Sequence, residues 1–361
     1  MKRLLNLATL FARKPPPVGT TPADVVHAEN KWRLLRYRRR EAARFRTPVL
    51  LVPSLINRHY VLDLLPGKSF AEWLVERGHE VYCVDWGTPG DEDRYLTFDD
   101  VCDRYIGRAL RKTGAERAHV LGYCMGGSLA AIHAAAHPER FASLVTLAAP
   151  VRFSRAGLLG LWTRSRTFEP RALVEALGNV PWQLLQSSFH MLRPTLPASK
   201  LVHMVDRAWD DEFLDGFLAL ETWGNDNVSF PGECWRTWIE ELYRRDAFAK
   251  GAFSLSGKPV RVEDVTCPLL VVTFEHDDIV PRETAQELFD RAGSPDKQVL
   301  HLPGGHVGAV VSRGASRKLW PALSEFWATR EAARPTARAA ATTAASSKRS
   351  IRATRGTRPG H

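Results

Sequence analysis

Several features that define other classes of protein are missing from this sequence of 361 residues. Its five cysteines are an odd number without regular spacing, so we expect no disulfide framework and infer a reducing, cytoplasmic environment. No apolar run reaches the roughly 18 residues of a transmembrane helix. The apolar stretch near the N-terminus is short and runs into Arg13 without a small-residue cleavage site, so we do not interpret it as a signal peptide.

Recognisable metal and phosphate sites are missing as well. The 12 histidines are scattered, and no Cys/His pair has the spacing of a zinc site, so we expect no metal centre. The sequence contains no glycine-rich phosphate-binding loop, and it identifies no residues that would bind a cofactor.

The positive charge of the chain belongs to its two ends. The net charge is +10, yet residues 1–46 carry 12 Lys/Arg against 3 Asp/Glu, and residues 331–361 carry 7 against 1. The body between them is therefore mildly acidic, which argues against nucleic-acid binding by the folded core. The sequence leaves open whether the basic ends bind anionic surfaces or are simply solvated.

Short apolar runs alternate with helix-like segments through most of the chain. Predicted strands cover residues 34–38, 48–53, 79–86, 119–121, 143–148, 268–274 and 298–302, and predicted helices cover residues 69–78, 97–112, 127–137 and 317–330. This alternation is typical of a mostly parallel sheet covered by helices on both faces. Between residues 151 and 258 the sequence has helix-like segments, scattered tryptophans and no clear strand run, so we expect a helical cap inserted over the sheet.

The chain thus divides into five parts. They are a basic lead-in, flexible or amphipathic, at residues 1–20; the first part of the core at 21–150; the cap at 151–258; the second part of the core at 259–330; and a basic tail at 331–361. The tail is rich in Ala, Thr, Arg and Ser and has almost no large apolar residues. We therefore expect it to be disordered.

A cysteine flanked by glycines lies between the strand at 119–121 and the helix after it. The run Gly122-Tyr-Cys-Met-Gly126 matches the nucleophile elbow of the α/β-hydrolase fold, with Cys124 in place of the usual serine. The glycines fit a strained turn in which larger side chains would collide with the neighbouring strand and helix. The alternative interpretation is a buried structural cysteine.

Two backbone N–H groups are expected to bind the oxyanion of an acyl intermediate. The N–H of Met125 would begin the helix after Cys124 and point at the oxyanion. The loop after the strand at 48–53 occupies the position of the second donor in this fold, where either Leu55 or Ile56 would supply the N–H.

Two further loops follow predicted strands in the order that this fold requires. Asp277 comes after the strand at 268–274, and His306 comes after the strand at 298–302. Both lie at C-terminal strand ends, where such sheets place their sites. The order Cys124, Asp277, His306 is the nucleophile, acid and histidine order of α/β-hydrolases and favours a catalytic triad. His306 would accept the thiol proton, and Asp277 would orient the imidazole.

The choice of cysteine favours acyl transfer over hydrolysis. A thioester on Cys124 is nearly isoenergetic with a thioester of coenzyme A, so transfer to the enzyme and onward stays reversible. A serine ester would be a lower-energy resting state, which suits hydrolysis. We therefore expect a coenzyme A thioester as the substrate and no separate cofactor.

In these residues and in further motifs, the chain resembles the polyhydroxyalkanoate synthases, most closely the short class III type that works with a separate partner subunit. The resemblance covers about residues 21–330. Besides the lipase-like box around Cys124, it rests on colinear motifs at residues 21–26, 34–37, 57–64, 84–89, 93–100, 223–226, 277–281 and 304–306.

The resemblance implies polymerisation of (R)-3-hydroxyacyl-CoA into a polyester with release of coenzyme A. Cys124 would hold the growing chain, His306 would activate the thiol, and Asp277 would help to activate the 3-hydroxyl of the incoming unit. It also implies a homodimer, a separate small synthase subunit, and action at the surface of polyester granules in the cytoplasm.

Two features depart from the pattern of that family. Asp278 follows the predicted catalytic aspartate where the family often has histidine, and His276 precedes it. Tyr123 and Met125, on either side of the predicted nucleophile, are bulkier than we expect in a short synthase and would narrow the pocket.

The sequence leaves three functions open and favours the polyester synthase. A cysteine-dependent thioesterase or hydrolase of the same fold would release free hydroxy acid instead of polymer. A non-catalytic homologue would bind granules or a partner subunit without using Cys124, and the intact set of Cys124, Asp277 and His306 argues against it.

Overall fold

The structure, a computed structural model, describes residues 2–9, 12–192, 194–312 and 314–331. Of the basic tail, only Glu331 lies among them, where its carboxylate accepts a hydrogen bond from the backbone N–H of Thr47 at 2.8 Å. The predicted disorder of the tail concerns residues outside the described part of the chain.

A central sheet of eight strands, in the order β1-β2-β4-β3-β5-β6-β9-β10, organises the molecule. Neighbouring strands from β4 to β10 are parallel, whereas β1 and β2 run antiparallel at one edge. The strands are β1 (Ala23–Glu29), β2 (Trp32–Tyr37), β3 (Val49–Val52), β4 (Val81–Asp85), β5 (Ala118–Tyr123), β6 (Phe141–Leu147), β9 (Leu269–Phe274) and β10 (Lys297–Leu302).

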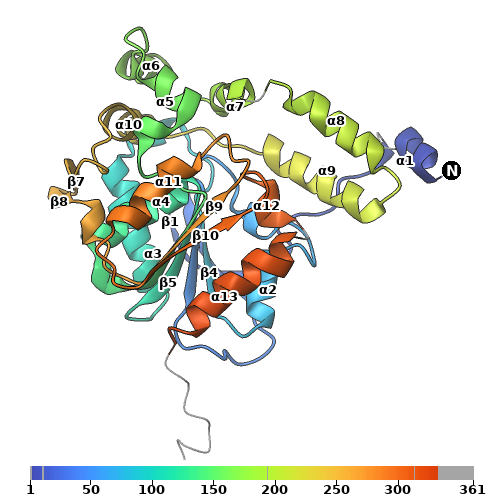
Figure 1. Ribbon diagram of the computed structural model, residues 1–361, viewed down its shortest axis with the longest axis horizontal. Coiled ribbons are helices and arrows are strands. Elements are labelled where there is room, and N and C mark those ends of the chain that lie inside the picture. Colours follow the sequence, from blue (N-terminus) through green and yellow to red (C-terminus); the bar gives the residue numbers. More distant parts are fainter. Residues whose placement is uncertain (1, 10–11, 193, 313, 332–361) are drawn as a thin grey trace, which may run out of the picture.

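Helices cover both faces of this sheet (Figure 1), so the predicted α/β-hydrolase fold is confirmed. One layer holds α3 (Ile106–Lys112), α4 (Met125–Ala136) and α11 (Arg282–Arg291), and the other holds α2 (Phe70–Glu76), α12 (Gly308–Val311) and α13 (Trp320–Ala328). Because apolar side chains pack on both faces, central strands such as β3 and β9 are buried along their whole length. Among the described residues, no helix is long and apolar enough to cross a lipid bilayer.

The N-terminal edge of the sheet differs from the prediction. The strand expected to be first is the second, β2, and β1 precedes it as an edge strand. β1 is largely exposed, with Val25 and Val26 at 52% and 38%. An edge strand of this kind lacks the buried apolar run by which the inner strands are recognised.

The cap consists mainly of helices, as expected. They are α5 (Gly157–Thr163), α6 (Pro170–Leu177), α7 (Trp182–Leu192), α8 (Leu196–Asp206), α9 (Asp211–Asn225), α10 (Gly232–Thr237) and the π-helical η7 (Trp238–Arg244). In Figure 1, α8 and α9 lie side by side and extend away from the sheet. The expectation of no strand before residue 258 was wrong, because β7 (Phe253–Leu255) pairs with β8 (Lys258–Val260) in a hairpin. Three-residue strands are too short to give a period-two signal.

The lead-in of the chain, expected to be flexible or amphipathic, contains helix α1 (Lys2–Thr9). This helix lies beside the ends of α8 and α9 (Figure 1). The Asn6 amide donates to the carbonyl of Ala208 at 2.7 Å and to the carboxylate of Asp211 at 2.9 Å. Nζ of Lys2 lies 2.9 Å from the same carboxylate. Positive charge of the lead-in therefore contacts acidic groups of the cap.

Candidate active site

Cys124 occupies a sharp turn between a buried strand and a helix. β5 ends at the residue before it and α4 begins at the residue after it. Its φ of 54° and ψ of −124° are unusual for a residue with a side chain, and such a conformation persists only where the surrounding structure imposes it. The thiol is partly exposed, whereas the other four cysteines are buried. Strain and access together mark Cys124 as the candidate nucleophile.

Close backbone contacts account for the glycines around Cys124. A Cβ atom at Gly126 would lie 2.1 Å from the carbonyl oxygen of Val52, and one at Gly122 would lie 2.4 Å from Cα of Gly127. Atoms at such separations overlap, so only glycine allows the strand, the turn and the helix to approach this closely.

The structure brings the three predicted triad residues together at the C-terminal ends of β5, β9 and β10. Nδ1 of His306 lies 2.8 Å from Oδ2 of Asp277, and both side chains are buried. Oδ1 of Asp277 accepts hydrogen bonds from the backbone N–H groups of Ile279 and Val280, at 3.0 and 2.8 Å. With both oxygens engaged, the carboxylate holds the His306 ring in one orientation beside Cys124.

The electrostatic surroundings of His306 favour its charged form. Burial on its own lowers the pKa of the imidazole, but the charges of Cys124 and Asp277 and hydrogen bonds to both outweigh burial and raise the pKa of His306 to about 10. An imidazolium at His306 and a thiolate at Cys124 would stabilise each other in this site, and the thiolate is the nucleophilic form of cysteine.

Two of the three candidate oxyanion donors border the same cavity as Cys124. Met125 and Ile56 line this cavity, whereas Leu55 borders a small separate hollow. The arrangement favours Ile56 over Leu55 as the second donor. The carbonyl of Ile56 accepts the N–H of Val228 at 3.1 Å, so the position of this loop depends on the cap.

The residues that depart from the family pattern lie around His306. Tyr123 is buried, its hydroxyl donates to the carbonyl of His306 at 3.3 Å, and the two ring centroids are 5.5 Å apart. Tyr123 therefore supports the histidine as well as bordering the cavity. His276 and Asp278 line a second cavity that also reaches His306.

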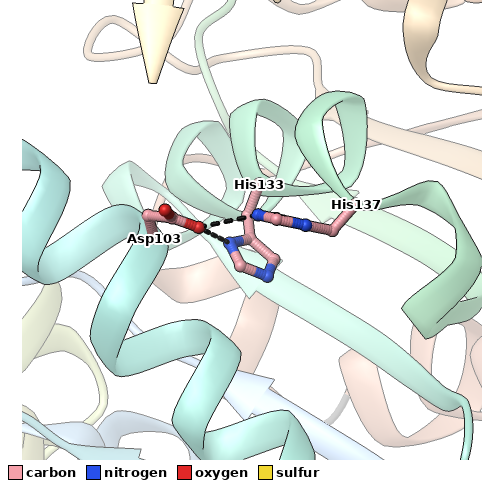
Figure 2. Close-up of side chains that lie close together, drawn as sticks. All are labelled: Asp103, His133 and His137. Atoms are coloured by element: carbon pink, nitrogen blue, oxygen red, sulfur yellow. Dashed lines mark hydrogen bonds and ion pairs between the residues drawn. The ribbon is translucent and has the colours of Figure 1, made fainter. Parts of the chain in front are cut away.

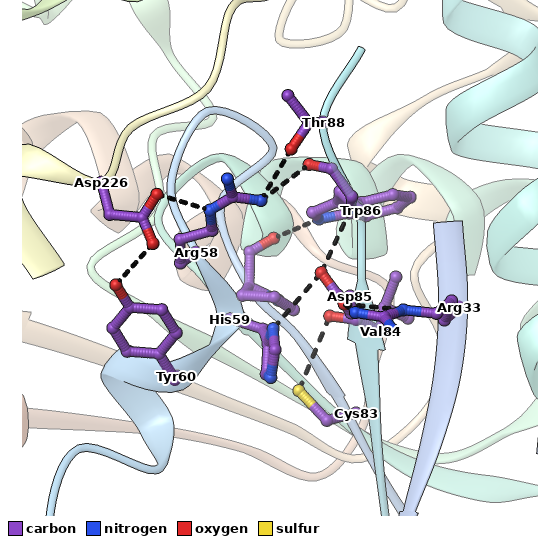
Figure 3. A network of polar contacts seen from close by, with 12 residues as sticks. Arg33, Arg58, His59, Tyr60, Cys83, Val84, Asp85, Trp86, Thr88 and Asp226 are labelled. Carbon is purple, nitrogen blue, oxygen red and sulfur yellow. Dashed lines mark hydrogen bonds and ion pairs between the residues drawn. The ribbon is translucent and has the colours of Figure 1, made fainter. Parts of the chain in front are cut away.

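A polar network fixes the loop that carries Ile56 to the cap (Figure 3). Asp226, which follows α9, accepts hydrogen bonds from Nε of Arg58 at 3.0 Å and from the hydroxyl of Tyr60 at 2.8 Å. Nε1 of Trp223 donates to the carbonyl of Arg58 at 2.9 Å. These residues belong to two motifs for which sequence reasoning offered no role, and the structure identifies them as positioning residues.

A buried carboxylate extends this network beneath the loop (Figure 3). Asp85, at the end of β4, accepts hydrogen bonds from Nε of Arg33 and from the backbone N–H of Gly87, both at 3.1 Å, and lies 3.3 Å from Nδ1 of His59. Burial raises the pKa of Asp85, but these contacts outweigh it and hold the pKa below its usual range. Asp85 is thus a buried anion around which the loop is ordered.

A cavity of about 550 Å³ lies between the core and the cap. Cys124 and His306 border it from the core, and α7, α8 and α9 border it from the cap. A second cavity of about 690 Å³ adjoins the first and shares part of its wall, including His306, Lys200 and Phe217. The lining of the second cavity includes three cationic side chains, Lys68, Lys200 and Arg207, and three histidines, His203, His276 and His306.

One cluster contradicts the description of the histidines as scattered. Asp103, His133 and His137 each offer one possible metal ligand, and these three atoms lie within 4.8 Å of one another. The two histidines are four residues apart at the end of α4, so they lie one helical turn apart. The spacing of the two histidines could be recognised in the sequence, whereas the proximity of Asp103 to them could not.

Comparison with known proteins identifies the class of the chain and then its family. A family model described as alpha/beta hydrolase fold matches residues 47–311, and one described as Poly-beta-hydroxybutyrate polymerase (PhaC) N-terminus matches residues 16–74. The chain is 35% identical over 334 residues to the Poly(3-hydroxyalkanoate) polymerase subunit PhaC of Allochromatium vinosum, covering 90% of this chain and 92% of that protein. It therefore belongs to the PhaC family of poly(3-hydroxyalkanoate) polymerase subunits.

Other relatives differ in length or share only the fold. The PhaC subunit of Haloferax mediterranei is 35% identical over 319 residues, and the match covers 87% of this chain but 65% of that protein. Among solved structures, a thermophilic esterase from Thermogutta terrifontis has a TM-score of 0.53 at 17% identity, covering 86% of this chain and 98% of that one. A Paleococcus ferrophilus monoacylglycerol lipase has a TM-score of 0.52 at 18% identity, covering 79% and 97%. At these identities the likeness shows the fold alone.

Proposed function

We propose that this chain polymerises (R)-3-hydroxyacyl-CoA into a polyester and releases coenzyme A. The relatives named as poly(3-hydroxyalkanoate) polymerases support this function. The observation that carries it is Cys124 at a strained nucleophile elbow beside a buried pair of His306 and Asp277. Cysteine keeps the enzyme-bound acyl group at the energy of the incoming coenzyme A thioester, which is what repeated acyl transfer requires.

The first step is attack of the Cys124 thiolate on the thioester carbonyl. A carbon–sulfur bond forms to Cys124, and the bond to coenzyme A breaks, so coenzyme A leaves as the thiol after taking the proton of His306. The backbone N–H groups of Met125 and Ile56 stabilise the oxyanion of the tetrahedral intermediate. Asp277 orients the imidazole and stabilises its charged form.

Chain growth uses the change in charge that acylation produces. Once Cys124 is acylated, its negative charge is gone, and that charge is the largest of the influences that raise the pKa of His306. The pKa of His306 therefore falls, and the neutral ring can accept a proton from the 3-hydroxyl of the next unit. The hydroxyl oxygen then attacks the thioester, an ester forms, and Cys124 leaves as a thiolate beside the imidazolium. The lengthened chain is now a thioester of coenzyme A, and repetition of the first step returns it to Cys124 and releases that coenzyme A.

In this proposal Asp277 acts on the hydroxyl through His306. Both of its oxygens already accept hydrogen bonds, and its side chain is fully buried. Direct abstraction of the hydroxyl proton by Asp277 would first require one of these bonds to break. The contacts of the carboxylate thus support a positioning role.

The two cavities suit the two halves of the substrate. The cavity beside Cys124 has a largely apolar wall that includes Trp182, Phe189 and Phe217, which suits the acyl chain. The adjoining cavity has Lys68 and Arg207 in its wall and shares Lys200 with the first cavity, which suits the phosphates of coenzyme A. The two lysines and the arginine also pair with carboxylates, so the phosphates would compete for them.

We propose the same assembly for this chain that the resemblance implies: a homodimer or larger assembly, working with a separate small subunit at a cytoplasmic granule surface. Several cap helices carry exposed apolar side chains that such contacts would cover. They are Leu158 and Leu161 on α5, Leu177 on α6, Leu184 and Met191 on α7, and Leu201 and Val202 on α8.

The test supplies purified full-length protein with (R)-3-hydroxybutyryl-CoA and follows both free coenzyme A and the size of the product. We expect coenzyme A release together with insoluble polyester, lost in Cys124→Ala and retained in Cys267→Ala, which removes a buried cysteine outside the site. Release of monomeric acid alone would identify a thioesterase. No reaction, even with a candidate small subunit added, would overturn the proposal.

A further inference from the structure

A histidine–aspartate cluster lies at the C-terminal end of α4, the helix whose N-terminus adjoins Cys124 (Figure 2). Oδ1 of Asp103, in the π-helical segment η4 (Asp100–Tyr105), lies 2.7 Å from Nε2 of His137 and 3.8 Å from Nδ1 of His133. Both dashed contacts in Figure 2 converge on this one oxygen. The twelve residues of α4 span about 18 Å, so the cluster is separate from the active site.

The ring of His133 presents an unused electron pair to this cluster. The residue is 1% exposed, and its Nδ1 has no hydrogen-bond partner among the described residues. In the neutral tautomer that carries its proton on Nε2, the ring presents a lone pair at Nδ1, which is the form in which histidine binds a metal.

Contacts with residues outside the cluster also orient the side chains of Asp103 and His137. Oδ2 of Asp103 accepts a hydrogen bond from the hydroxyl of Ser256 at 2.6 Å, which turns Oδ1 toward the histidines. Nδ1 of His137 faces Oε1 of Glu139 at 3.8 Å. About a quarter of the Asp103 and His137 side chains is exposed, so the cluster is open to solvent on one side.

We propose that Asp103, His133 and His137 bind a divalent transition-metal cation, with Zn²⁺ as the best-fitting ion and water as its fourth ligand. Two imidazoles and one carboxylate with an open position are a common zinc ligand set. Ligand atoms around tetrahedral Zn²⁺ are about 3.3 Å apart, and the two observed separations lie on either side of that value. The cation replaces the proton between His137 and Asp103, and a neutral His137 then carries its proton on Nδ1, facing Glu139.

The proposed ion lies too far from Cys124 to take part in the reaction there, and its expected effect is on stability. It joins η4 to the end of α4, and through Ser256 it also reaches the hairpin of β7 and β8. The carbonyl end of a helix favours a cation. Metal binding there would stabilise the helix that supports the nucleophile elbow at its other end.

The test measures zinc binding by calorimetry and metal analysis on full-length protein without a histidine tag. All proteins carry Cys124→Ala, because the thiol beside His306 is itself a possible zinc ligand. We expect one zinc ion per chain in this parent, a rise in its melting temperature on zinc addition, and reversal by a chelator.

Variants of the proposed zinc-binding residues, together with one control variant, test whether zinc binds at this cluster. We expect His137→Gln and Asp103→Asn each to weaken binding by about 100-fold or more, whereas His301→Gln, at an exposed histidine outside the cluster, leaves it unchanged. His137 is partly exposed, so its variant is expected to fold, which circular dichroism checks. Absence of zinc binding by the parent, or equal affinity in the parent and His137→Gln, overturns the proposal.

Discussion

Oδ2 of Asp277 lies 2.8 Å from Nδ1 of His306, and Oδ1 of the same carboxylate is held by two backbone N–H groups. This arrangement presents the other nitrogen of the ring to the thiol of Cys124. In the proposed mechanism, the Asp277 carboxylate does not exchange a proton itself; it orients the imidazole and stabilises its charged form.

Asp277→Asn tests this relationship by preserving the shape of the side chain while removing its charge. We expect kcat to fall by about 10³- to 10⁴-fold, because the amide stabilises the wrong tautomer and loses the attraction for the imidazolium. Steady-state release of coenzyme A measures the change. A loss of less than about tenfold would contradict the role assigned to Asp277.

The pKa of His306 is a second, independent measure of the same site. Burial lowers this pKa, while the thiolate of Cys124 and the carboxylate of Asp277 raise it to about 10. Cys124→Ala removes the thiolate, so the pKa of His306 should fall, and the ring should lose its proton at lower pH. Titration of the ring signals by NMR in the wild type and in Cys124→Ala measures the shift. An unchanged pKa would exclude the change in charge on which the proposed chain growth depends.

Gly126→Ala tests the steric requirement of the elbow. The added Cβ would lie 2.1 Å from the carbonyl oxygen of Val52, so the helix or the strand must move. We expect destabilisation by about 1–3 kcal/mol and loss of activity. Gly224→Ala is the control, because no atom lies within 4 Å of its added Cβ. Chemical denaturation compares the two variants, and equal stabilities would show that the contact at Gly126 is tolerated.

Asp226→Ala tests whether the cap positions the oxyanion loop. The change removes the shared acceptor of Arg58 and Tyr60. Displacement of the loop that carries Ile56 should lower kcat by between about tenfold and a hundredfold. Asp24→Ala is a suitable control, since it breaks an exposed pair with Arg38 away from the site. Similar kinetics in the two variants would mean that the network does not position the loop.

The buried His79 predicts a loss of stability in mild acid. Burial, followed by the nearby His119, lowers the pKa of His79 to about 4, whereas an unfolded histidine titrates near 6.5. Below pH 6.5 the unfolded chain therefore binds a proton that the native state excludes, and stability falls until the pH reaches about 4. This group alone should cost about 2 kcal/mol at pH 5 relative to pH 7.

His79→Phe should remove this part of the pH dependence. The ring stacks on Phe45 at 4.3 Å, so an aromatic replacement fits the site, although it leaves Ser324 without its partner. Denaturant unfolding at both pH values, in the wild type and in the variant, provides the comparison. The same acid sensitivity in both proteins would assign the effect to other groups.

The fold and the proximity of the three predicted triad residues could be predicted from the sequence because both depend on local patterns. Cys124 and Asp277 each follow a short apolar run that forms an inner strand, and His306 follows the edge strand β10, all in the order that the topology demands. The edge strand β1 and the hairpin of β7 and β8 give no such signal, because they are exposed or only three residues long.

Contacts between distant segments could not be inferred from the sequence. Arg58 and Asp226 are 168 residues apart, and nothing in either motif indicates that one accepts the hydrogen bond of the other. Asp103 approaches His137 only because η4 packs beside α4. The choice between Leu55 and Ile56 likewise depends on which residue borders the cavity, a property of the folded loop.

The most direct test of the central claim is the mass of the intact protein during turnover with (R)-3-hydroxybutyryl-CoA. The proposal predicts a series of adducts that differ by one hydroxybutyryl unit, attached to Cys124 through a bond that neutral hydroxylamine cleaves, and absent from Cys124→Ala. A single hydroxybutyryl adduct that never lengthens would contradict polymerisation and identify a thioesterase. Adducts of equal abundance in Cys124→Ala would contradict the role of Cys124.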